Sequence, residues 1–427
     1  MLRFLRRLIP ERSPLRLGYH KILAIGSAVW FWFPAKKLKI IAVTGTSGKS
    51  TTCELIYTLL HESGQSVGML SGIQFHFPSG TELNESLRTT LRSWSVQKYL
   101  RRMLNEGCVY AVVEVSSHAI DQHRLWGVPV DIAVLTNVAT GEHLDYHGTF
   151  AEYVQTKARL FRNVPTVVLN RDDSRVEIFE KSASGAEILD FSRKTKEATV
   201  FATSEKMSAG ETSFDLSIRG EKARIDISLT GEHNIENTLA AVAVAQKTGV
   251  SLSIIKKSLA RFKGVPGRLE PIDEGQDFTV LVDHTYKPPA LRAVLTTLKK
   301  ITPEKLFVVW GGTGNRLSSF WSEAGEILHE LADEIVLTTD DPYKDDPRKI
   351  SQIVREKIPR QEGDGFFEIT DRYEAIRYAL FVAENGDTVL VAGRGCEQTQ
   401  TIGTKVISFD DREVCREIIR QENAKNF

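Results

Sequence analysis

The sequence predicts an α/β protein built from a doubly wound, mostly parallel central domain and a smaller, Rossmann-like α/β domain. Three observations lead to this prediction. Short apolar runs alternate with helical stretches from residue 37 onward. A glycine-rich turn joins the first run to a helix, as in a P-loop. The alternation stops at 265–267 (Val-Pro-Gly) and then restarts. We therefore expect an N-terminal segment (1–37), a P-loop-containing central domain (38–266) and a C-terminal domain (267–427).

Length and composition agree with a globular protein of more than one domain. A chain of 427 residues is long enough for two or three domains. Its net charge of zero does not favour nucleic acid, and we expect no such partner. The four cysteines are widely scattered and form no C-x-x-C pair, so that neither zinc nor a disulfide framework is indicated. A reducing, cytoplasmic setting fits this pattern best.

The N-terminal segment is basic and ends in aromatic residues. Up to residue 39 it carries nine cationic side chains against Glu11: Arg3, Arg6, Arg7, Arg12, Arg16, Lys21, Lys36, Lys37 and Lys39. The charge-free run Ile22–Phe33 is shorter than the roughly 20 residues that span a bilayer. One interpretation is a helix that packs its aromatic end on the next domain. The other is an interfacial anchor over residues 1–33, which would place a cytoplasmic protein at the inner face of the membrane.

The central domain opens with a strand, a glycine loop and a helix. Ile40–Val43 is a short apolar run suited to a strand buried on both faces. Gly45 and Gly48 allow a tight turn, and the helical spacing of apolar residues begins directly after it, over 53–62. This geometry directs several backbone N–H groups and a helix N-terminus toward one point, which suits a phosphate.

The residues after the second glycine carry the expected chemistry. Lys49 would contact the β- and γ-phosphates of a nucleotide, and the Ser50 hydroxyl would bind a magnesium ion. Val43 stands where the longer Walker pattern has a glycine, so this is the shorter G-T-x-G-K-S form. We expect the chain to bind a nucleoside triphosphate.

The later elements follow from the same periodicities. In the central domain we expect strands at 110–115, 132–135 and 166–169, helices at 96–106, 149–161 and 234–248, and an antiparallel hairpin over 213–229. After the linker, short apolar runs predict four strands, at 279–282, 306–309, 334–337 and 388–391.

Polar residues end or follow two of the central strands or lie on the helix after the second. Glu114 ends a strand beside the glycine loop, where a magnesium ligand would lie. His143 begins a His-Leu-Asp-Tyr-His loop after the next strand; such a cluster alone is more typical of a polar surface. Tyr153 and Lys157 share one helix face, where a lysine is normally a solvated charge.

In the second domain, Arg268 and Asp283 are candidates to contact a nucleotide. Residues 340–342 (Asp-Asp-Pro) and 393–397 (Gly-Arg-Gly-Cys-Glu) follow strands, although each stretch alone is more typical of a turn.

The order of these motifs resembles that of the Mur ligases, and among them the UDP-N-acetylmuramoyl-tripeptide synthetases of the MurE type. The likeness covers residues 38–420. The matching stretches are 43–52, Glu114-Val-Ser-Ser-His118, Gln122-His-Arg124, Thr136-Asn137, His143-Leu-Asp-Tyr-His-Gly148, Tyr153-x-x-x-Lys157, 231–237, Gly267-Arg-Leu-Glu270, Asp340-Asp-Pro342 and Phe409-Asp-Asp-Arg-Glu413. Family members normally carry an N-terminal uridine-binding domain. Here the resemblance implies that the short basic and aromatic segment takes its place.

The resemblance implies a role for each matched residue. The magnesium ligands and catalytic residues would be Lys49, Ser50, Glu114, His143 and Lys157, with Lys157 carbamylated. ATP would be held also by Gly45, Thr46, Gly48, Thr51, Asn234, Asn237, Arg268 and Asp283. The UDP-muramoyl-peptide and the amino acid would be bound by Thr89, Thr90, Ser116, Gln122, Arg124, Asp341, Gly393 and Glu397. The implied activity is that of an ATP-dependent ligase that forms an amide bond through an acyl phosphate. Such an enzyme would act in the synthesis of peptidoglycan precursors, on which cell shape and cell division depend.

Departures from the family pattern concern the amino-acid acceptor. Tyr343 replaces the arginine of Asp-Asn-Pro-Arg, and 393–397 replaces Gly-Lys-Gly-His-Glu. They predict an acceptor other than meso-diaminopimelate, unless Arg394 supplies the missing cation. Three alternatives remain open: a folylpolyglutamate-synthase-like ligase, a ligase for a different amine, and a non-catalytic ATP-binding regulator.

Overall fold

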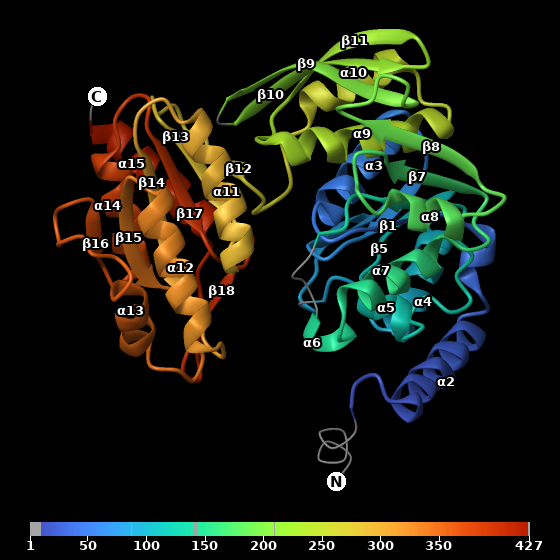
Figure 1. Cartoon of the computed structure of the whole chain (residues 1–427), viewed down its shortest axis with the longest axis horizontal. Helices are drawn as coiled ribbons and strands as arrows, with labels where there is room; N and C mark the ends of the chain where they lie inside the picture. Colours follow the sequence, from blue (N-terminus) through green and yellow to red (C-terminus); the bar gives the residue numbers. More distant parts are fainter. Residues whose placement is uncertain (1–9, 87, 140–143, 209, 426–427) are drawn as a thin grey trace. The chain divides into compact units, whose positions relative to one another are not determined.

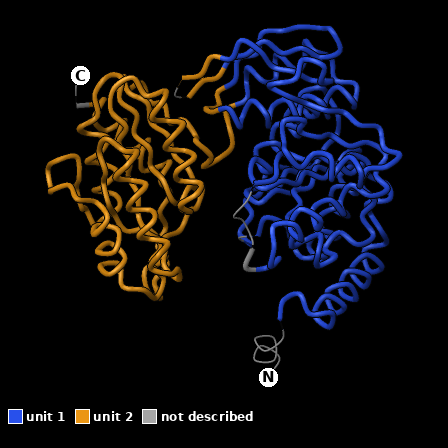
Figure 2. The backbone as a smooth tube through the Cα atoms, in the orientation of Figure 1, with its two compact units in different colours: residues 1–205, 213–227, 232–262 blue, residues 206–212, 228–231, 263–427 orange. Residues whose placement is uncertain are grey.

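The computed structural model describes residues 10–86, 88–139, 144–208 and 210–425. These residues form two compact units, coloured separately in Figure 2. Unit 1 comprises 1–205, 213–227 and 232–262, and unit 2 comprises 206–212, 228–231 and 263–427. Both contain sheets of mainly parallel strands with helices packed on them, which confirms the predicted α/β class. No helix of the described residues is long and apolar enough to span a membrane.

Eleven strands of the described chain form the larger sheet (Figure 1). In sheet order they are β11 (Glu221–Ile227), β10 (Glu211–Ile218), β9 (Val200–Ser208), β8 (Glu187–Ser192), β7 (Thr166–Asn170), β6 (Ile132–Leu135), β1 (Lys39–Thr44), β5 (Tyr110–Glu114), β2 (Val67–Leu70), β3 (Gln74–Phe77) and β4 (Gly80–Leu83). All the predicted central strands are confirmed, and so is the hairpin, as β10 and β11. The additional strands β2, β3, β4, β8 and β9 were not predicted.

β1 lies between β5 and β6 and determines where the loops meet. Val43 pairs with Glu114 in parallel register, and Thr44 pairs with Leu135. The carboxyl ends of the three strands therefore lie at one edge of the sheet. The residues 40–43 are fully buried because helices cover both faces, which explains an uninterrupted apolar run.

The helices of unit 1 connect and cover these strands. They are α2 (Pro14–Trp30), η1 (Pro34–Lys37), α3 (Lys49–Glu62), α4 (Ser93–Asn105), α5 (Ser117–Asp121), α6 (Leu144–His147), α7 (Phe150–Ala158), η2 (Arg159–Phe161), α8 (Val176–Ser182), α9 (Glu232–Lys247) and α10 (Leu252–Arg261). Leu100 and Met103 of α4 pack on one face of the sheet, and Phe161 and Phe179 pack in a second cluster. α3 and α9 lie against each other, as Figure 1 shows.

The N-terminal helix packs on α4. Ser13 caps α2 by accepting a hydrogen bond from Arg16 N at 3.3 Å, and proline follows at the first helical position. Its buried residues are small, which allows the close approach. The Phe31 and Trp94 rings are 4.9 Å apart at their centroids, so the predicted packing of the aromatic end on the next domain is confirmed. Five arginines of this segment were predicted to lie near lipid phosphates. Arg12 instead pairs with Asp121 and Glu152, and Arg16 pairs with Glu11, while Arg3, Arg6 and Arg7 lie outside the described residues.

Unit 2 has a six-stranded sheet, in which β12 alone is antiparallel to its neighbour. In sheet order its strands are β12 (Glu270–Pro271), β13 (Thr279–Asp283), β17 (Thr388–Ala392), β14 (Leu306–Gly312), β15 (Glu334–Thr339) and β16 (Phe366–Glu368), and β18 (Thr399–Ile402) pairs with β19 (Lys405–Ser408). Its helices are α11 (Pro288–Ile301), α12 (Ser318–Leu331), α13 (Pro347–Arg355), α14 (Arg372–Val382) and α15 (Asp411–Lys425). The four predicted strands are confirmed, and Trp310 of β14 lies in the core.

Candidate active site

The glycine loop between β1 and α3 fits tightly against two other segments. Gly48 has φ +78° and caps α3, and a methyl group there would lie 2.1 Å from Asn237 Oδ1. A methyl group on Gly45 would lie 1.8 Å from Thr136 Oγ1. Ser47 N donates a hydrogen bond to Asn137 Oδ1 at 3.1 Å. Only glycine fits at either of the two close approaches, and the loop is thereby fixed from both sides.

Lys49 is the first residue of α3 and folds back over the loop. Its Nζ donates hydrogen bonds to Gly45 O at 3.1 Å and Thr46 O at 2.8 Å. The ammonium group therefore lies beside the N-terminus of α3, which itself favours an anion. The N-terminus of α3 and the ammonium group of Lys49 together form a region suited to phosphate oxygens.

Ser50 and Glu114 meet next to this region. Ser50 Oγ donates to Glu114 Oε2 at 2.9 Å, and Gly72 N donates to the same oxygen at 2.7 Å. The parallel pairing of β1 and β5 places Glu114 beside the loop, as predicted. A hydroxyl and a buried carboxylate are ligands that magnesium prefers, so the residues present fit that ion. His143, the further predicted ligand, lies outside the described residues.

Lys157 of α7 is buried beneath the loop, with 1% of its surface exposed. Its Nζ donates to Gly45 O at 2.7 Å and lies 4.7 Å from the centroid of the Tyr153 ring. The Tyr153 hydroxyl contacts Thr46 Oγ1 at 3.0 Å. The expectation of a solvated surface lysine is wrong here, because α7 packs this face against the loop. A buried ammonium is costly, so its position requires a specific role or partner.

Two asparagines of α9 border the loop from the other side. Thr52 Oγ1 donates to Asn237 Oδ1 at 3.3 Å, and Asn237 Nδ2 donates to Asn234 Oδ1 at 3.0 Å. Both amides are buried. Thr51 is buried in the same first turn of α3. The contact of these amides with adenine stays a prediction.

Four of the residues predicted to bind the muramoyl-peptide, Thr90, Ser116, Gln122 and Arg124, form one network beyond the end of β5. Thr90 Oγ1 donates to Glu114 O at 3.0 Å and accepts from Ser116 N at 2.8 Å. Arg124 Nη1 donates to Thr90 O at 2.6 Å, and Nη2 donates to Gln122 Oε1 at 2.8 Å. Burial and the nearby Arg88 lower the pKa of Arg124 to about 10, while it still remains a cation at neutral pH.

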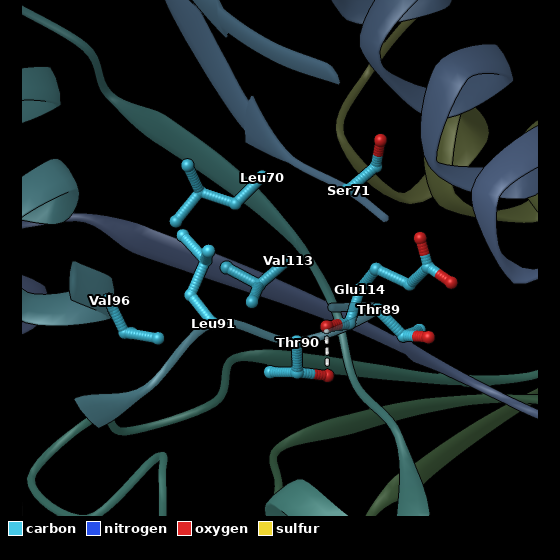
Figure 3. Close-up of a pocket in the computed structure, with 8 residues that line it drawn as sticks. All are labelled: Leu70, Ser71, Thr89, Thr90, Leu91, Val96, Val113 and Glu114. Atoms are coloured by element: carbon cyan, nitrogen blue, oxygen red, sulfur yellow. Dashed lines mark hydrogen bonds between the residues drawn. The ribbon is translucent and has the colours of Figure 1, made fainter. Parts of the chain in front are cut away.

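A pocket adjoins this network at the ends of β2 and β5 (Figure 3). Leu70, Leu91 and Val113 gather on one side of it, and the Glu114 carboxylate points away from them. Thr89, also in the lining, is exposed. The pocket therefore joins an apolar surface to the carboxylate beside the glycine loop.

In unit 2, Arg268 and Asp283 lie near each other. Asp283 is buried and accepts a hydrogen bond from Leu269 N at 2.7 Å. Burial raises its pKa to about 6, although the cation of Arg268 and the N–H of Leu269 oppose this. Contact of either residue with a nucleotide stays a prediction.

The predicted acceptor loops of unit 2 contain a buried ion-pair cluster. Arg394 has no exposed surface, and its Nη1 donates to Asp341 Oδ1 at 2.9 Å and Asp340 Oδ1 at 3.2 Å. Thr401 N also donates to Asp341 Oδ1, at 2.6 Å. Burial raises the pKa of Glu397 to about 7, against the effect of Arg394. The cation of Arg394 is thus already neutralised, which opposes the idea that it could replace the missing arginine.

Three residues hold the site together in ways that the sequence did not predict, although Thr136 and Asn137 belong to a matching stretch and Arg12 to the basic segment. Thr136 Oγ1 donates to Ser47 O at 2.7 Å, and Asn137 binds the same loop. Thr136 and Asn137 directly follow β6, in the same way that Glu114 ends β5. This shared position at the carboxyl ends of neighbouring strands is the signal that could have identified their role. Arg12 contacts α5, and no signal in its own sequence neighbourhood indicates this.

Two known protein domain families match this chain. The Mur ligase middle domain matches residues 43–245, and the Mur ligase glutamate ligase domain matches residues 267–395. A UDP-N-acetylmuramoyl-L-alanyl-D-glutamate–2,6-diaminopimelate ligase of Geobacillus kaustophilus is 36% identical over 94% of this chain and 83% of its own. A Clostridium botulinum protein of the same name is 35% identical over 94% and 82%.

Solved structures agree with these sequence matches. A 2,6-diaminopimelate ligase of the same name superposes with a TM-score of 0.69 at 31% identity, over 90% of this chain and 79% of that one. A folylpolyglutamate synthase of Mycobacterium tuberculosis gives 0.67 at 16% identity, over 87% and 91%, which shows a shared fold alone. The middle-domain match spans the glycine loop, Glu114, Lys157 and both asparagines described above. The chain therefore belongs to the Mur ligase family.

Proposed function

We propose that this protein is an ATP- and magnesium-dependent ligase that joins an amino acid to a UDP-N-acetylmuramoyl-peptide in cytoplasmic peptidoglycan precursor synthesis. One observation carries the proposal. Glu114 holds Ser50 of the glycine loop with its carboxylate, and its backbone carbonyl holds Thr90 of the predicted peptide site. A single residue thus joins the predicted phosphate site to the predicted peptide site. The names of the relatives support the same activity.

The residues of the chain suit activation of a carboxylate by phosphoryl transfer. The peptide carboxylate would attack the γ-phosphate of ATP, which releases ADP and forms an acyl phosphate. The amino group of the acceptor would then displace phosphate and lose a proton to solvent. Lys49 and the N-terminus of α3 would stabilise the charge of the transferring group. Magnesium, held by Ser50 and Glu114, would supply further charge neutralisation.

We further propose that Lys157 is carbamylated in the active enzyme. Its Nζ is buried beside the loop and the Glu114–Ser50 pair adjoins the same loop. A bare ammonium there would repel a magnesium ion, whereas addition of carbon dioxide turns the side chain into an anion that can bind one. A mass spectrum of active protein would detect the added group.

Phosphate release tests the main proposal. Purified protein with ATP, magnesium, UDP-muramoyl-dipeptide and a panel of amino acids should release phosphate in an amino-acid-dependent manner. Absence of release with every amino acid would contradict the proposal. Release with a dihydrofolate and glutamate instead would favour the folylpolyglutamate-like alternative, and ATP binding without turnover would favour the regulatory alternative.

The acceptor is predicted to differ from meso-diaminopimelate. The relatives are named for that amino acid, but Tyr343 stands where the family has an arginine for its second carboxylate. Arg394 is committed to Asp340 and Asp341. A carboxylate buried without a cation should lose affinity by orders of magnitude. Competing amino acids in one reaction and weighing the products tests this, and a dominant diaminopimelate product would refute it.

We also propose that the N-terminal segment contacts a membrane surface rich in anionic lipid. Exposed apolar side chains recur at helical spacing on α2 and continue past its end: Leu15, Tyr19, Ile22, Leu23, Trp30 and Trp32. Trp94 of α4 lies beside Trp30, with ring centroids 5.8 Å apart. Lys21, Lys36 and Lys37 are exposed in the same segment. An apolar helix face with nearby cations matches an interfacial anchor better than a purely apolar partner.

Vesicle flotation tests this contact. The protein should float with vesicles that contain phosphatidylglycerol, less so at high salt, and Ile22→Glu should abolish flotation. Leu317→Ala, which removes an equally exposed apolar side chain from unit 2, is the control and should float normally. No flotation at low salt would refute the proposal. Dimerisation that Ile22→Glu abolishes would instead assign the face to a second copy.

A further inference from the structure

Arg12 connects the N-terminal segment to three helices of the candidate active site. Its Nε donates to Asp121 Oδ2 of α5 at 3.2 Å. Its Nη1 donates to His147 O at the end of α6 at 2.8 Å and to the Glu152 carboxylate of α7. These helices are separated from Arg12 by more than a hundred residues of sequence. The guanidinium of Arg12 therefore contacts three helices, α5, α6 and α7, that are distant from it in the sequence.

The contact with Asp121 continues into the predicted peptide site. Asp121 is buried and also accepts hydrogen bonds from Arg159 Nη2 at 2.7 Å and Tyr146 OH at 3.1 Å. Tyr146 OH in turn accepts from Gln122 Nε2 at 3.4 Å. Gln122 accepts from Arg124, whose guanidinium holds Thr90. An unbroken chain of hydrogen bonds thus runs from Arg12 to the residues beside Glu114.

The other two contacts of Arg12 are with the last residue of α6 and with α7, the helix that carries Lys157. His147 ends the helix after residues 140–143, and its Nε2 contacts Ser117 Oγ at 2.9 Å. Glu152 lies on α7, five residues before Lys157. An isolated ion pair on the surface contributes little to stability. The contacts of Arg12 differ from such a pair, because Asp121 is buried and the acceptors belong to three helices.

We propose that Arg12 is a positioning residue for the UDP-muramoyl-peptide site. It holds α5, α6 and α7 in one arrangement, so that Gln122 and Arg124 are fixed before the peptide binds. The N-terminal segment is then a structural part of the peptide site. This inference rests on the proposed function for the identity of the substrate. The geometric part, that Arg12 orders these helices, does not depend on it.

Steady-state kinetics of three variants tests the substrate part. Arg12→Ala should raise KM for UDP-muramoyl-dipeptide by about tenfold or more, with KM for ATP within about twofold, since preorganised groups act on the ligand that they face. Arg12→Lys should fall between, because an ammonium retains the charge but cannot bridge the same acceptors. Lys37→Ala removes a cation from the same segment and should match the wild type. An equal rise in both KM values would overturn the proposal, and so would no change.

Hydrogen exchange provides a readout that needs no turnover. In the protein without substrate, Arg12→Ala should speed amide exchange in peptides covering 117–125 and 144–158, while peptides of unit 2 stay unchanged. Unchanged exchange in those two regions would refute the ordering role, whatever the activity. Failure of the wild type to use UDP-muramoyl-dipeptide, with the exchange effect present, would refute the proposed function and the assigned substrate but leave the ordering by Arg12 in place.

Discussion

The glycine loop of unit 1 and the 393–397 loop of unit 2 both follow parallel strands, but they treat their charges in opposite ways. Lys49 donates hydrogen bonds to carbonyls of its own loop and lies at a helix N-terminus. Its ammonium group and the helix dipole would both attract an anion. Arg394 is enclosed by two aspartates and has no exposed surface. Lys49 is proposed to contact a phosphate, whereas Arg394 is already paired with Asp340 and Asp341.

The two loops show when the role of a family motif can be assigned to the matching residues of this chain. The glycine-loop motif is kept, and its shape depends on its own glycines and on Thr136, Asn137 and Asn237, which pack against it. The loop of unit 2 departs from the family pattern, and the charge of Arg394 is neutralised by Asp340 and Asp341, which follow a different strand. A cation at a motif position is therefore not by itself evidence of a binding residue, because residues from another strand end can neutralise it, as Asp340 and Asp341 do for Arg394. Substitutions in the two loops should have different consequences.

The largest effect should come from Lys49→Ala. Turnover should fall by at least about 10³-fold, because the variant lacks the cation that stabilises the transferring phosphoryl group. The fold should persist, because Lys49 is only half-buried at the surface of the loop. Phosphate release and circular dichroism of the variant measure both effects. Wild-type turnover in Lys49→Ala would remove the contrast between the two loops.

Lys157→Ala should reduce turnover by about 10²-fold or more, and added acetate should restore part of it. The proposed carbamate would be missing, and a small carboxylate could enter the space that the side chain leaves. A lysine on the exposed surface, such as Lys181, provides the control substitution. If acetate does not help and an unmodified Lys157 is found in fully active protein, the carbamate proposal is wrong.

Arg394→Ala should act on stability before it acts on binding. Two buried aspartates would lose the cation to which they are hydrogen-bonded, with Arg372 still near Asp340, and loss of a buried ion-pair partner typically costs about 3–5 kcal/mol of unfolding free energy. Thermal unfolding should therefore shift strongly. Arg377→Ala removes a fully exposed cation of the same unit and should cause no measurable shift. A normally stable Arg394→Ala that loses only affinity for the amino acid would show that Arg394 is a binding residue after all.

The smallest expected effect is a pH dependence that arises from Asp283. Burial raises its pKa from 3.8 to about 6, so folding favours the protonated form. Its stabilising contribution is complete below pH 3.8 and is lost as pH rises through 6, at most about 3 kcal/mol. Urea unfolding between pH 4 and 7 should show this loss in the wild type and a shallower slope in Asp283→Asn. Equal slopes would mean that Asp283 does not titrate in this range.

The sequence was sufficient for what depends on local periodicity and strand order. The parallel strands after Lys39 place Glu114 next to Ser50, and this contact could be predicted because carboxyl ends of neighbouring parallel strands meet. Burial of Lys157 could not be predicted from spacing, because it depends on how α7 packs on the loop. The same holds for Arg394, whose partners come from the end of another strand, and for Arg12. Long-range ion pairs leave no periodic signal in a sequence.

The contact between α3 and α9 has a consequence for the order of events during synthesis. Thr52 and its partner Asn237 are 185 residues apart in the chain. Chains emerge from the ribosome from the N-terminus at about 5–20 residues per second, so the first turn of α3 exists for roughly 10 to 40 seconds before α9 does. Nascent protein must therefore expose an unfinished nucleotide loop, whose final shape depends on one of the last helices of unit 1. A ribosome-bound chain that ends before residue 232 should accordingly hold ATP less tightly than one that extends past 262.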